Sequence, residues 1–266
     1  MPGKIVVIGG AEDRKRRCTV LKSVLELSGE DNPRISVIAA ASSTPEETGE
    51  DYEAVFGELG AASVRVLKLS SRESARDRAA IDSLQEASII FLTGGDQLRL
   101  TGILGGTPLL EKLWSRFREG AIVAGTSAGA SALSGTMINS GGSEAPPQRG
   151  HIYLSPGLGF LPQVIVDQHF SQRGRFGRLM AAVSFNPSLL GLGIDEDTAV
   201  VVTENRWLKV IGSSGVNVID GAPLEYTNVY ETAPRETLTL SAFRLHVLAN
   251  GSQFDLQGKK LVVPHA

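Results

Sequence analysis

The chain has one cysteine, Cys18, in 266 residues. A single cysteine excludes an internal disulfide and any zinc site built from cysteines. Positive charge is also not in excess, because 26 Lys and Arg residues stand against 29 Asp and Glu residues and leave a net charge of −3. A protein that binds nucleic acid across its surface needs a basic excess, so we expect no nucleic-acid partner.

Long apolar runs are absent as well. The longest apolar stretches, such as residues 88–93, have the length of a strand and fall far short of the roughly 20 residues of a membrane helix. The first residues lead directly into the apolar run 5–8 and lack the charged segment, apolar segment and cleavage site of a secretory signal. We therefore expect a cytoplasmic protein with no membrane partner.

Apolar runs of strand length alternate with stretches that favour helices, which is typical of parallel strands covered on both faces. This pattern predicts a single α/β domain over residues 1–266, with a doubly wound, mostly parallel, three-layer sheet and a small antiparallel C-terminal part. Ligands of such folds bind at the carboxyl ends of the strands. The predicted strands are 5–10, 35–41, 64–69, 89–94 and 121–125, the predicted helices are 14–27, 46–59, 73–87 and 109–119, and short antiparallel strands are expected at 199–202, 207–211, 216–219 and 238–248.

A first glycine-rich turn, Gly9-Gly10-Ala11-Glu12-Asp13, follows the first predicted strand. Its spacing does not match a dinucleotide fingerprint, and it has no P-loop lysine. Glu12 and Asp13 would also place negative charge where a pyrophosphate binds. We interpret this turn as the start of a helix favoured by acidic residues, and no nucleotide cofactor is expected.

The pentapeptide Gly125-Thr126-Ser127-Ala128-Gly129 matches G-x-S-x-G between a predicted strand and a helix-compatible segment. This setting is typical of a nucleophile elbow, in which a sharp turn exposes a serine hydroxyl. The Ala128 N–H would point toward a developing oxyanion. An ordinary glycine-rich turn that caps a helix is the alternative interpretation. A second turn, residues 93–97, ends the preceding strand and would bring the Gly95 N–H close to Ser127 as a second oxyanion donor.

All four histidines follow Ser127 in the chain, and His169 is the best candidate for a general base. It ends an apolar strand whose last residues become polar, where an α/β fold places functional groups. A third group must orient the imidazole. The acidic turn 193–197 offers Glu196, although spacing alone does not separate Glu196 from Asp195.

Three arginines, Arg173, Arg175 and Arg178, follow His169 within nine residues. Such charge runs usually form a solvated helix face. Their density beside a candidate nucleophile instead favours a site for carboxylates, which guanidinium groups bind in a bidentate way. Asp167 could meet a cationic group of the same ligand.

Together these motifs resemble the cyanophycinases, a serine peptidase family that also contains aspartyl dipeptidases. Five segments in order carry the resemblance: Gly-Gly-Ala-Glu-Asp (9–13), Thr-Gly-Gly-Asp-Gln (93–97), Gly-Thr-Ser-Ala-Gly-Ala (125–130), Asp-Gln-His-Phe with the three arginines (167–178) and Gly-Ile-Asp-Glu-Asp-Thr-Ala (193–199). The resemblance implies a flavodoxin-like fold related to class I glutamine amidotransferases and a homodimer. It implies hydrolysis of cyanophycin, a poly-aspartate whose side-chain carboxyls carry arginine, to β-aspartyl-arginine dipeptides.

The same resemblance implies the roles of individual residues. Ser127 would be the nucleophile, His169 the general base and Glu196 its orienting partner, with Gly95 and Ala128 as backbone oxyanion donors and with no metal or other cofactor. The implied substrate contacts are Gln97, Asp167, Gln168, Arg173, Arg175 and Arg178. An aspartyl dipeptidase on the same scaffold and a non-catalytic binding protein are the alternatives. The glycine- and proline-rich segment 140–150 is expected to be a loop, and its role is left open.

Overall fold

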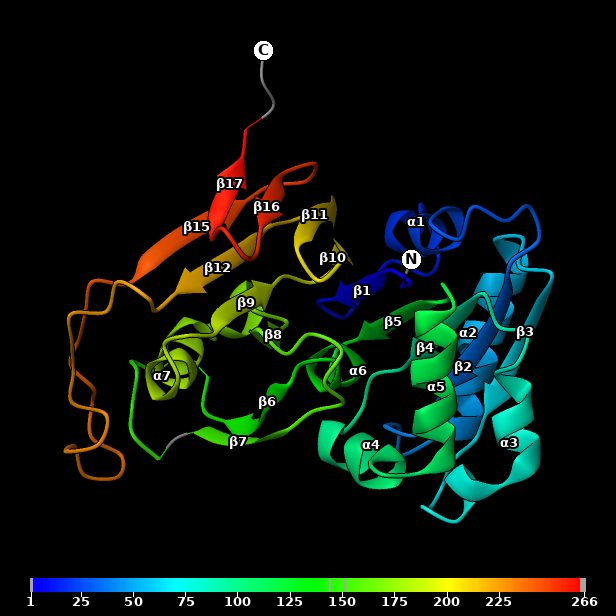
Figure 1. Cartoon of the computed structure of the whole chain (residues 1–266), viewed down its shortest axis with the longest axis horizontal. Helices are drawn as coiled ribbons and strands as arrows, with labels where there is room; N and C mark the ends of the chain where they lie inside the picture. The colour runs from blue at the N-terminus through cyan, green and yellow to red at the C-terminus, as the bar shows by residue number, and fades with distance from the viewer. Residues whose placement is uncertain (1, 144, 151, 264–266) are drawn as a thin grey trace.

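A computed structural model describes residues 2–143, 145–150 and 152–263 of the chain. Its central sheet has nine strands in the order β17-β16-β11-β10-β1-β5-β4-β2-β3. The last five strands of that order are parallel to one another and form the right-hand part of the molecule in Figure 1. They are β1 (Ile5–Ile8), β2 (Arg34–Ile38), β3 (Ser63–Leu67), β4 (Ile89–Leu92) and β5 (Ile122–Thr126).

Helices cover both faces of this parallel part. Alternate residues of β1 point to opposite faces, so Val6 and Ile8 pack with α1 (Thr19–Glu26) and α2 (Pro45–Glu58), while Ile5 and Val7 lie in a second core. That second core contains side chains of α3 (Arg78–Ser83), α4 (Gln97–Leu104), α5 (Pro108–Arg118) and α6 (Ala128–Ala132). The predicted α/β architecture with three layers is therefore present in the parallel part of the sheet. Among the described residues, no helix is long and apolar enough to cross a membrane.

Of the four antiparallel strands predicted near the C-terminus, 199–202 and 207–211 extend the central sheet, whereas 216–219 and part of 238–248 lie in a second sheet; two further strands of the central sheet were not predicted. The added strands are β10 (Thr198–Thr203), β11 (Trp207–Gly212), β16 (Gln253–Asp255) and β17 (Lys260–Val262). β10 pairs antiparallel with β1, and each further strand pairs antiparallel with its neighbour. The antiparallel part is thus larger than the sequence predicted.

A second sheet, which the sequence did not predict, has the order β15-β12-β9-β8. Its strands are β8 (Val164–Gln168), β9 (Leu190–Ile194), β12 (Val216–Asp220) and β15 (Arg244–Leu248), and only β8 and β9 are parallel. α7 (Phe176–Phe185) packs on one face of this sheet. Residues of the other face, such as Val166 and Leu192, belong to the same core as α4 and α5.

Short elements connect these layers. β6 (Thr136–Gly141) and β7 (Ile152–Pro156) form a hairpin, so the loop expected over 140–150 begins two residues later than predicted; residue 144 lies outside the described residues. β13 (Tyr226–Thr227) pairs with β14 (Leu240–Ser241), and two 3-10 turns, η1 (Ser74–Arg76) and η2 (Ser171–Arg173), complete the elements.

Two predicted helices differ from the structure for identifiable reasons. The stretch 14–18 is not helical, because the Asp13 carboxylate accepts hydrogen bonds from the backbone amides of residues 15–18 and holds them in a loop. The stretch 73–87 is interrupted at Asp77, whose backbone is extended at ψ 130° and whose side chain caps α3. In both cases nearby backbone amides bond to an aspartate side chain and not to the carbonyls of a continuing helix.

Candidate active site

Ser127 lies in a strained turn between β5 and α6. Its backbone has φ 51° and ψ −112°, a conformation that L-residues rarely adopt. Close packing requires glycine on both sides: a Cβ on Gly125 would lie 2.6 Å from the backbone of Gly129, and one on Gly129 would lie 2.3 Å from the carbonyl oxygen of Leu92. The geometry is that of the elbow predicted from G-x-S-x-G.

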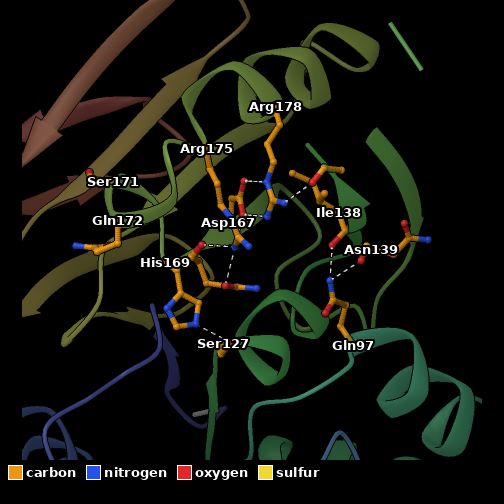
Figure 2. Close-up of polar contacts among 12 residues, drawn as sticks. Gln97, Ser127, Ile138, Asn139, Asp167, His169, Ser171, Gln172, Arg175 and Arg178 are labelled. Carbon is orange, nitrogen blue, oxygen red and sulfur yellow. Dashed lines mark hydrogen bonds and ion pairs between the residues drawn. The ribbon is translucent and has the colours of Figure 1, made fainter. Parts of the chain in front are cut away.

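His169 directly follows β8 and reaches Ser127 from the second sheet. Its Nε2 lies 3.0 Å from the Ser127 Oγ, a contact that Figure 2 shows as a dashed line. The His169 amide donates to the Gly9 carbonyl at 2.8 Å, and its backbone has φ 48°. The pair is thus assembled from the carboxyl ends of strands in two different sheets.

Glu196 is the acidic residue that bonds to His169. Its Oε1 lies 2.6 Å from the His169 Nδ1. Asp195 instead is buried and accepts hydrogen bonds from the Ser171 amide and the Ser214 hydroxyl, at 3.0 and 2.8 Å. Of the two acids that spacing left open, Glu196 is therefore the one that contacts the imidazole.

The surroundings of His169 favour its neutral imidazole. Burial lowers the pKa of His169 below its ordinary value of 6.5, and the charges of Arg173 and Arg175 lower it further. The hydrogen bond and the charge of Glu196 oppose this and raise the pKa. Because Glu196 accepts from Nδ1–H, the neutral tautomer leaves Nε2 free to accept the proton of the Ser127 hydroxyl.

The two amides expected to bind an oxyanion lie at the same edge of the sheet. A Cβ built on Gly94 would lie 3.4 Å from the Ser127 Cβ, so the turn after β4 touches the elbow. Gly95 has φ +136° and packs against the Ala41 carbonyl, where no other residue fits. Within the described part of the chain, neither the Gly95 nor the Ala128 amide forms a hydrogen bond.

The predicted arginine cluster is divided into buried and exposed members. Arg178 holds Asp167 with two nitrogens, Nε at 2.6 Å and Nη2, and it also donates to the Gly141 carbonyl at 3.3 Å. Arg175 donates to the carbonyl and side-chain oxygen of Gln168 and lies 3.4 Å from Asp167. Figure 2 shows these side chains gathered above His169. Burial lowers the pKa of Arg175 to about 10, which leaves its charge intact at neutral pH.

The remaining members of the predicted substrate set lie elsewhere around the site. Arg173 is exposed in η2. Gln97, at the start of α4, donates its amide nitrogen to the carbonyls of Ile138 and Asn139 on β6, both at 2.9 Å (Figure 2). Asp167 is only 1% exposed, and both of its oxygens accept from arginines of the protein itself.

Three residues that contact or support the site, Gly10, Gln172 and Glu12, were not among those that the sequence predicted. A Cβ on Gly10 would lie 2.5 Å from the Nε2 and Cε1 of His169, so this glycine forms the surface on which the imidazole rests. Gln172 accepts from the Glu196 amide at 3.1 Å. Glu12, interpreted as part of a helix start, is buried and bonded to Thr126. The composition of the motif 9–13 does not indicate that it packs against His169.

This geometry, a bonded serine, histidine and glutamate on an α/β sheet, defines a hydrolase-like site, and comparisons with known proteins agree with it. The model of peptidase family S51 matches residues 5–210. The cyanophycinase of Trichormus variabilis is 41% identical over 98% of this chain and 87% of its own length, and that of Geminocystis herdmanii is 39% identical over 94% and 93%. The chain belongs to peptidase family S51 and is accordingly a peptidase.

Solved structures share the fold at lower identity. A peptidase from an acI-B1 Actinobacterium aligns with a TM-score of 0.69 at 22% identity, covering 96% of this chain and 97% of that one. A putative peptidase E from Listeria monocytogenes aligns with a TM-score of 0.53 at 16% identity, covering 80% and 100%. At these identities the similarity concerns the fold alone.

Proposed function

We propose that this chain is a cyanophycinase, a serine peptidase that releases β-aspartyl-arginine from cyanophycin. The observation that carries the chemistry is the continuous chain of hydrogen bonds from Ser127 through His169 to Glu196, at 3.0 and 2.6 Å. The substrate is supported by relatives named cyanophycinase that are about 40% identical over nearly the whole chain.

In this proposal Ser127 Oγ attacks the carbonyl carbon of the peptide bond between two aspartates. His169 Nε2 takes the hydroxyl proton and gives it to the leaving amine, so the C–N bond breaks and an acyl-enzyme remains. Water then attacks the ester, again with His169 as the base, and frees the new carboxylate and Ser127. Glu196 holds the Nδ1–H tautomer and stabilises the imidazolium that forms.

The Gly95 and Ala128 amides are the proposed oxyanion donors. Two backbone N–H groups held by turns need no reorganisation as negative charge develops, and a single such donor accounts for a factor on the order of 10²–10³ in rate. Their position beside the Ser127 turn supports this role.

We propose that some of the polar residues around His169 contact the polymer directly and that others hold these residues in position. Arg173 is exposed beside His169, forms no ion pair within the described residues, and is the proposed cation for a substrate carboxylate. Gln97 keeps its side-chain oxygen for the substrate while its nitrogen binds β6. Arg175 and Arg178 line the site from behind, oriented by Gln168 and Asp167. We therefore assign Asp167 to positioning arginines, in place of the direct contact with a substrate guanidinium that its sequence position suggested.

An aspartyl dipeptidase is the second candidate. It stays a candidate because the family that the sequence motifs resemble also contains aspartyl dipeptidases. The relatives that are about 40% identical over nearly the whole chain are instead named cyanophycinases. We therefore rank the polymer above free dipeptides as substrate.

Four further properties complete the proposal. One apolar core contains residues of both sheets, which supports a single domain. The order of the parallel strands and the helices on both of their faces support a flavodoxin-like, glutamine amidotransferase-like class.

Localisation and oligomeric state are also part of the proposal. A single buried cysteine, Cys18, is consistent with a protein of the reducing cytoplasm. The homodimer rests on the resemblance to cyanophycinases, and analytical ultracentrifugation tests it.

The test of the function is incubation of the protein with insoluble cyanophycin, followed by mass analysis of the soluble fraction. We expect β-aspartyl-arginine from the wild type and none from Ser127→Ala, with the variant folded by circular dichroism. Free aspartyl dipeptides form a parallel arm. Cleavage of those dipeptides without release from the polymer would reverse the ranking, and turnover by Ser127→Ala would reject the nucleophile.

A further inference from the structure

Glu12 is a buried carboxylate that the proposed chemistry does not use. It is 6% exposed, and within the described residues it forms no ion pair. Its two oxygens accept hydrogen bonds from the Thr126 hydroxyl, at 2.7 Å, and from the Tyr52 hydroxyl. Burying a carboxylate with only neutral hydrogen-bond donors around it costs folding free energy, and an apolar side chain at this position would avoid that cost.

One of these partners directly precedes the candidate nucleophile. Thr126 is the last residue of β5 and is 2% exposed, while Ser127 next to it has the strained φ of 51°. A strained backbone persists only where its surroundings hold it in place. The Ser127 amide is held by the Ile8 carbonyl at 3.0 Å, and the Glu12 bond fixes the adjoining residue from the side chain.

The other partner belongs to a rigid part of the core. Tyr52 on α2 is 5% exposed and lies between aromatic rings, with centroids 4.8 Å from Phe91 on β4 and 6.0 Å from Phe56. Burial and the Glu12 charge raise the pKa of Tyr52 well above its ordinary value, so its hydroxyl stays a donor at physiological pH. Glu12 thus connects the elbow to a helix on the opposite side of the sheet from α6.

We propose that Glu12 is a positioning residue for Ser127, acting through Thr126 and anchored by Tyr52. The proposal rests on Ser127 being the nucleophile. The carboxylate accepts both hydroxyl protons at once, which fixes the Thr126 side chain and limits the rotation of the peptide that carries Ser127. Loss of this connection is expected to misplace the Oγ with respect to His169 Nε2 without removing any group that contacts substrate.

Thr126→Val is the most informative variant, because valine keeps the β-branched shape and removes only the hydroxyl. We expect kcat on the polymer to fall on the order of 10- to 100-fold, with KM within about threefold of the wild type. The rate at which a fluorophosphonate labels Ser127 should fall in parallel. Thr126→Ser, which restores a hydroxyl, should recover kcat, and Glu12→Gln should retain more activity than Glu12→Ala because an amide still bonds to both hydroxyls.

Ser88→Ala is the matched control. Ser88 is a buried hydroxyl that bonds to the Glu30 carboxylate before the start of β4, away from the elbow. This variant should lose a similar amount of thermal stability and keep kcat. The proposal is overturned if Thr126→Val lowers the melting temperature as Ser88→Ala does while kcat and labelling stay at the wild-type level, or if only KM changes. Activity of Ser127→Ala would instead remove the proposed function itself, whatever Thr126→Val shows.

Discussion

His169 illustrates at the scale of one residue how burial and neighbouring charge set a working pH. As the proposed base, His169 acts only when neutral, and burial together with the charge of Arg173 lowers its pKa below the ordinary value of 6.5. Activity should therefore persist below pH 6.5 and fall as the imidazole becomes protonated. Arg173→Gln removes one positive charge that lowers the pKa of His169 in the free enzyme, so the acidic limb of the kcat/KM profile should move to higher pH. Arg65→Gln, exposed on β3 at the far edge of the sheet, is the control; an unchanged limb in Arg173→Gln would contradict the electrostatic account.

Glu196 and Asp195 are neighbours in the chain, but substitution of Glu196 should mainly lower kcat and substitution of Asp195 should mainly lower the melting temperature. Glu196→Gln keeps the shape but loses the charge that stabilises the imidazolium, and kcat should fall on the order of 10²- to 10⁴-fold with little change in melting temperature. Asp195→Asn weakens two bonds that hold Ser171 and Ser214, so it should mainly lower the melting temperature. Kinetics and thermal unfolding of both variants check this. The reverse pattern would show that the acid has been assigned to the wrong residue.

At the scale of an element, the turn 9–13 shows how a glycine can position a catalytic side chain by close packing. Gly10 has φ +95° and leaves no room for a methyl group beside the imidazole. Gly10→Ala should push His169 away from Ser127 and lower kcat on the order of 100-fold. Gly29→Ala is the control, because Gly29 has φ +69° with nothing within 4 Å and should lose only about 1–2 kcal/mol of folding stability. Equal kcat values for the two variants would contradict the contact with His169.

Elements also differ in how far the sequence predicts them. The five parallel strands and the helices α2 and α5 follow from apolar runs and periodicity, and the structure confirms them. The loop at 14–18 could not be predicted, because the Asp13 carboxylate competes with the helix through contacts that periodicity does not register. For the site, the motifs predicted that Ser127, His169 and an acidic residue of the turn 193–197 would meet, and the structure brings these side chains together. The support from Gly10 and Glu12 depends on which segments meet across the sheet, and that is tertiary information.

At the scale of the whole molecule, the site joins two sheets, since Ser127 follows a strand of the central sheet and His169 a strand of the second. Buried Asp220 on β12 connects the same two sheets by an ion pair of 2.8 Å with Lys259, in the turn between β16 and β17. Asp220→Asn should destabilise the protein by about 1–3 kcal/mol, because the part-exposed cations Lys259 and Arg244 lose their charged partner. Denaturant titration measures this, with Asp82→Asn, from an exposed pair on α3, as a control expected near zero. A negligible loss for Asp220→Asn would contradict the role of this pair.

Labelling of the intact protein by a fluorophosphonate, followed by peptide mapping, tests the central claim most directly. A serine becomes reactive to this probe only when a base removes its proton and donors stabilise the adduct. We expect one adduct, on Ser127, which forms far more slowly in His169→Ala and not at all in Ser127→Ala. A protein that stays unlabelled under the same conditions, or an adduct on another serine with Ser127 unmodified, would contradict the account.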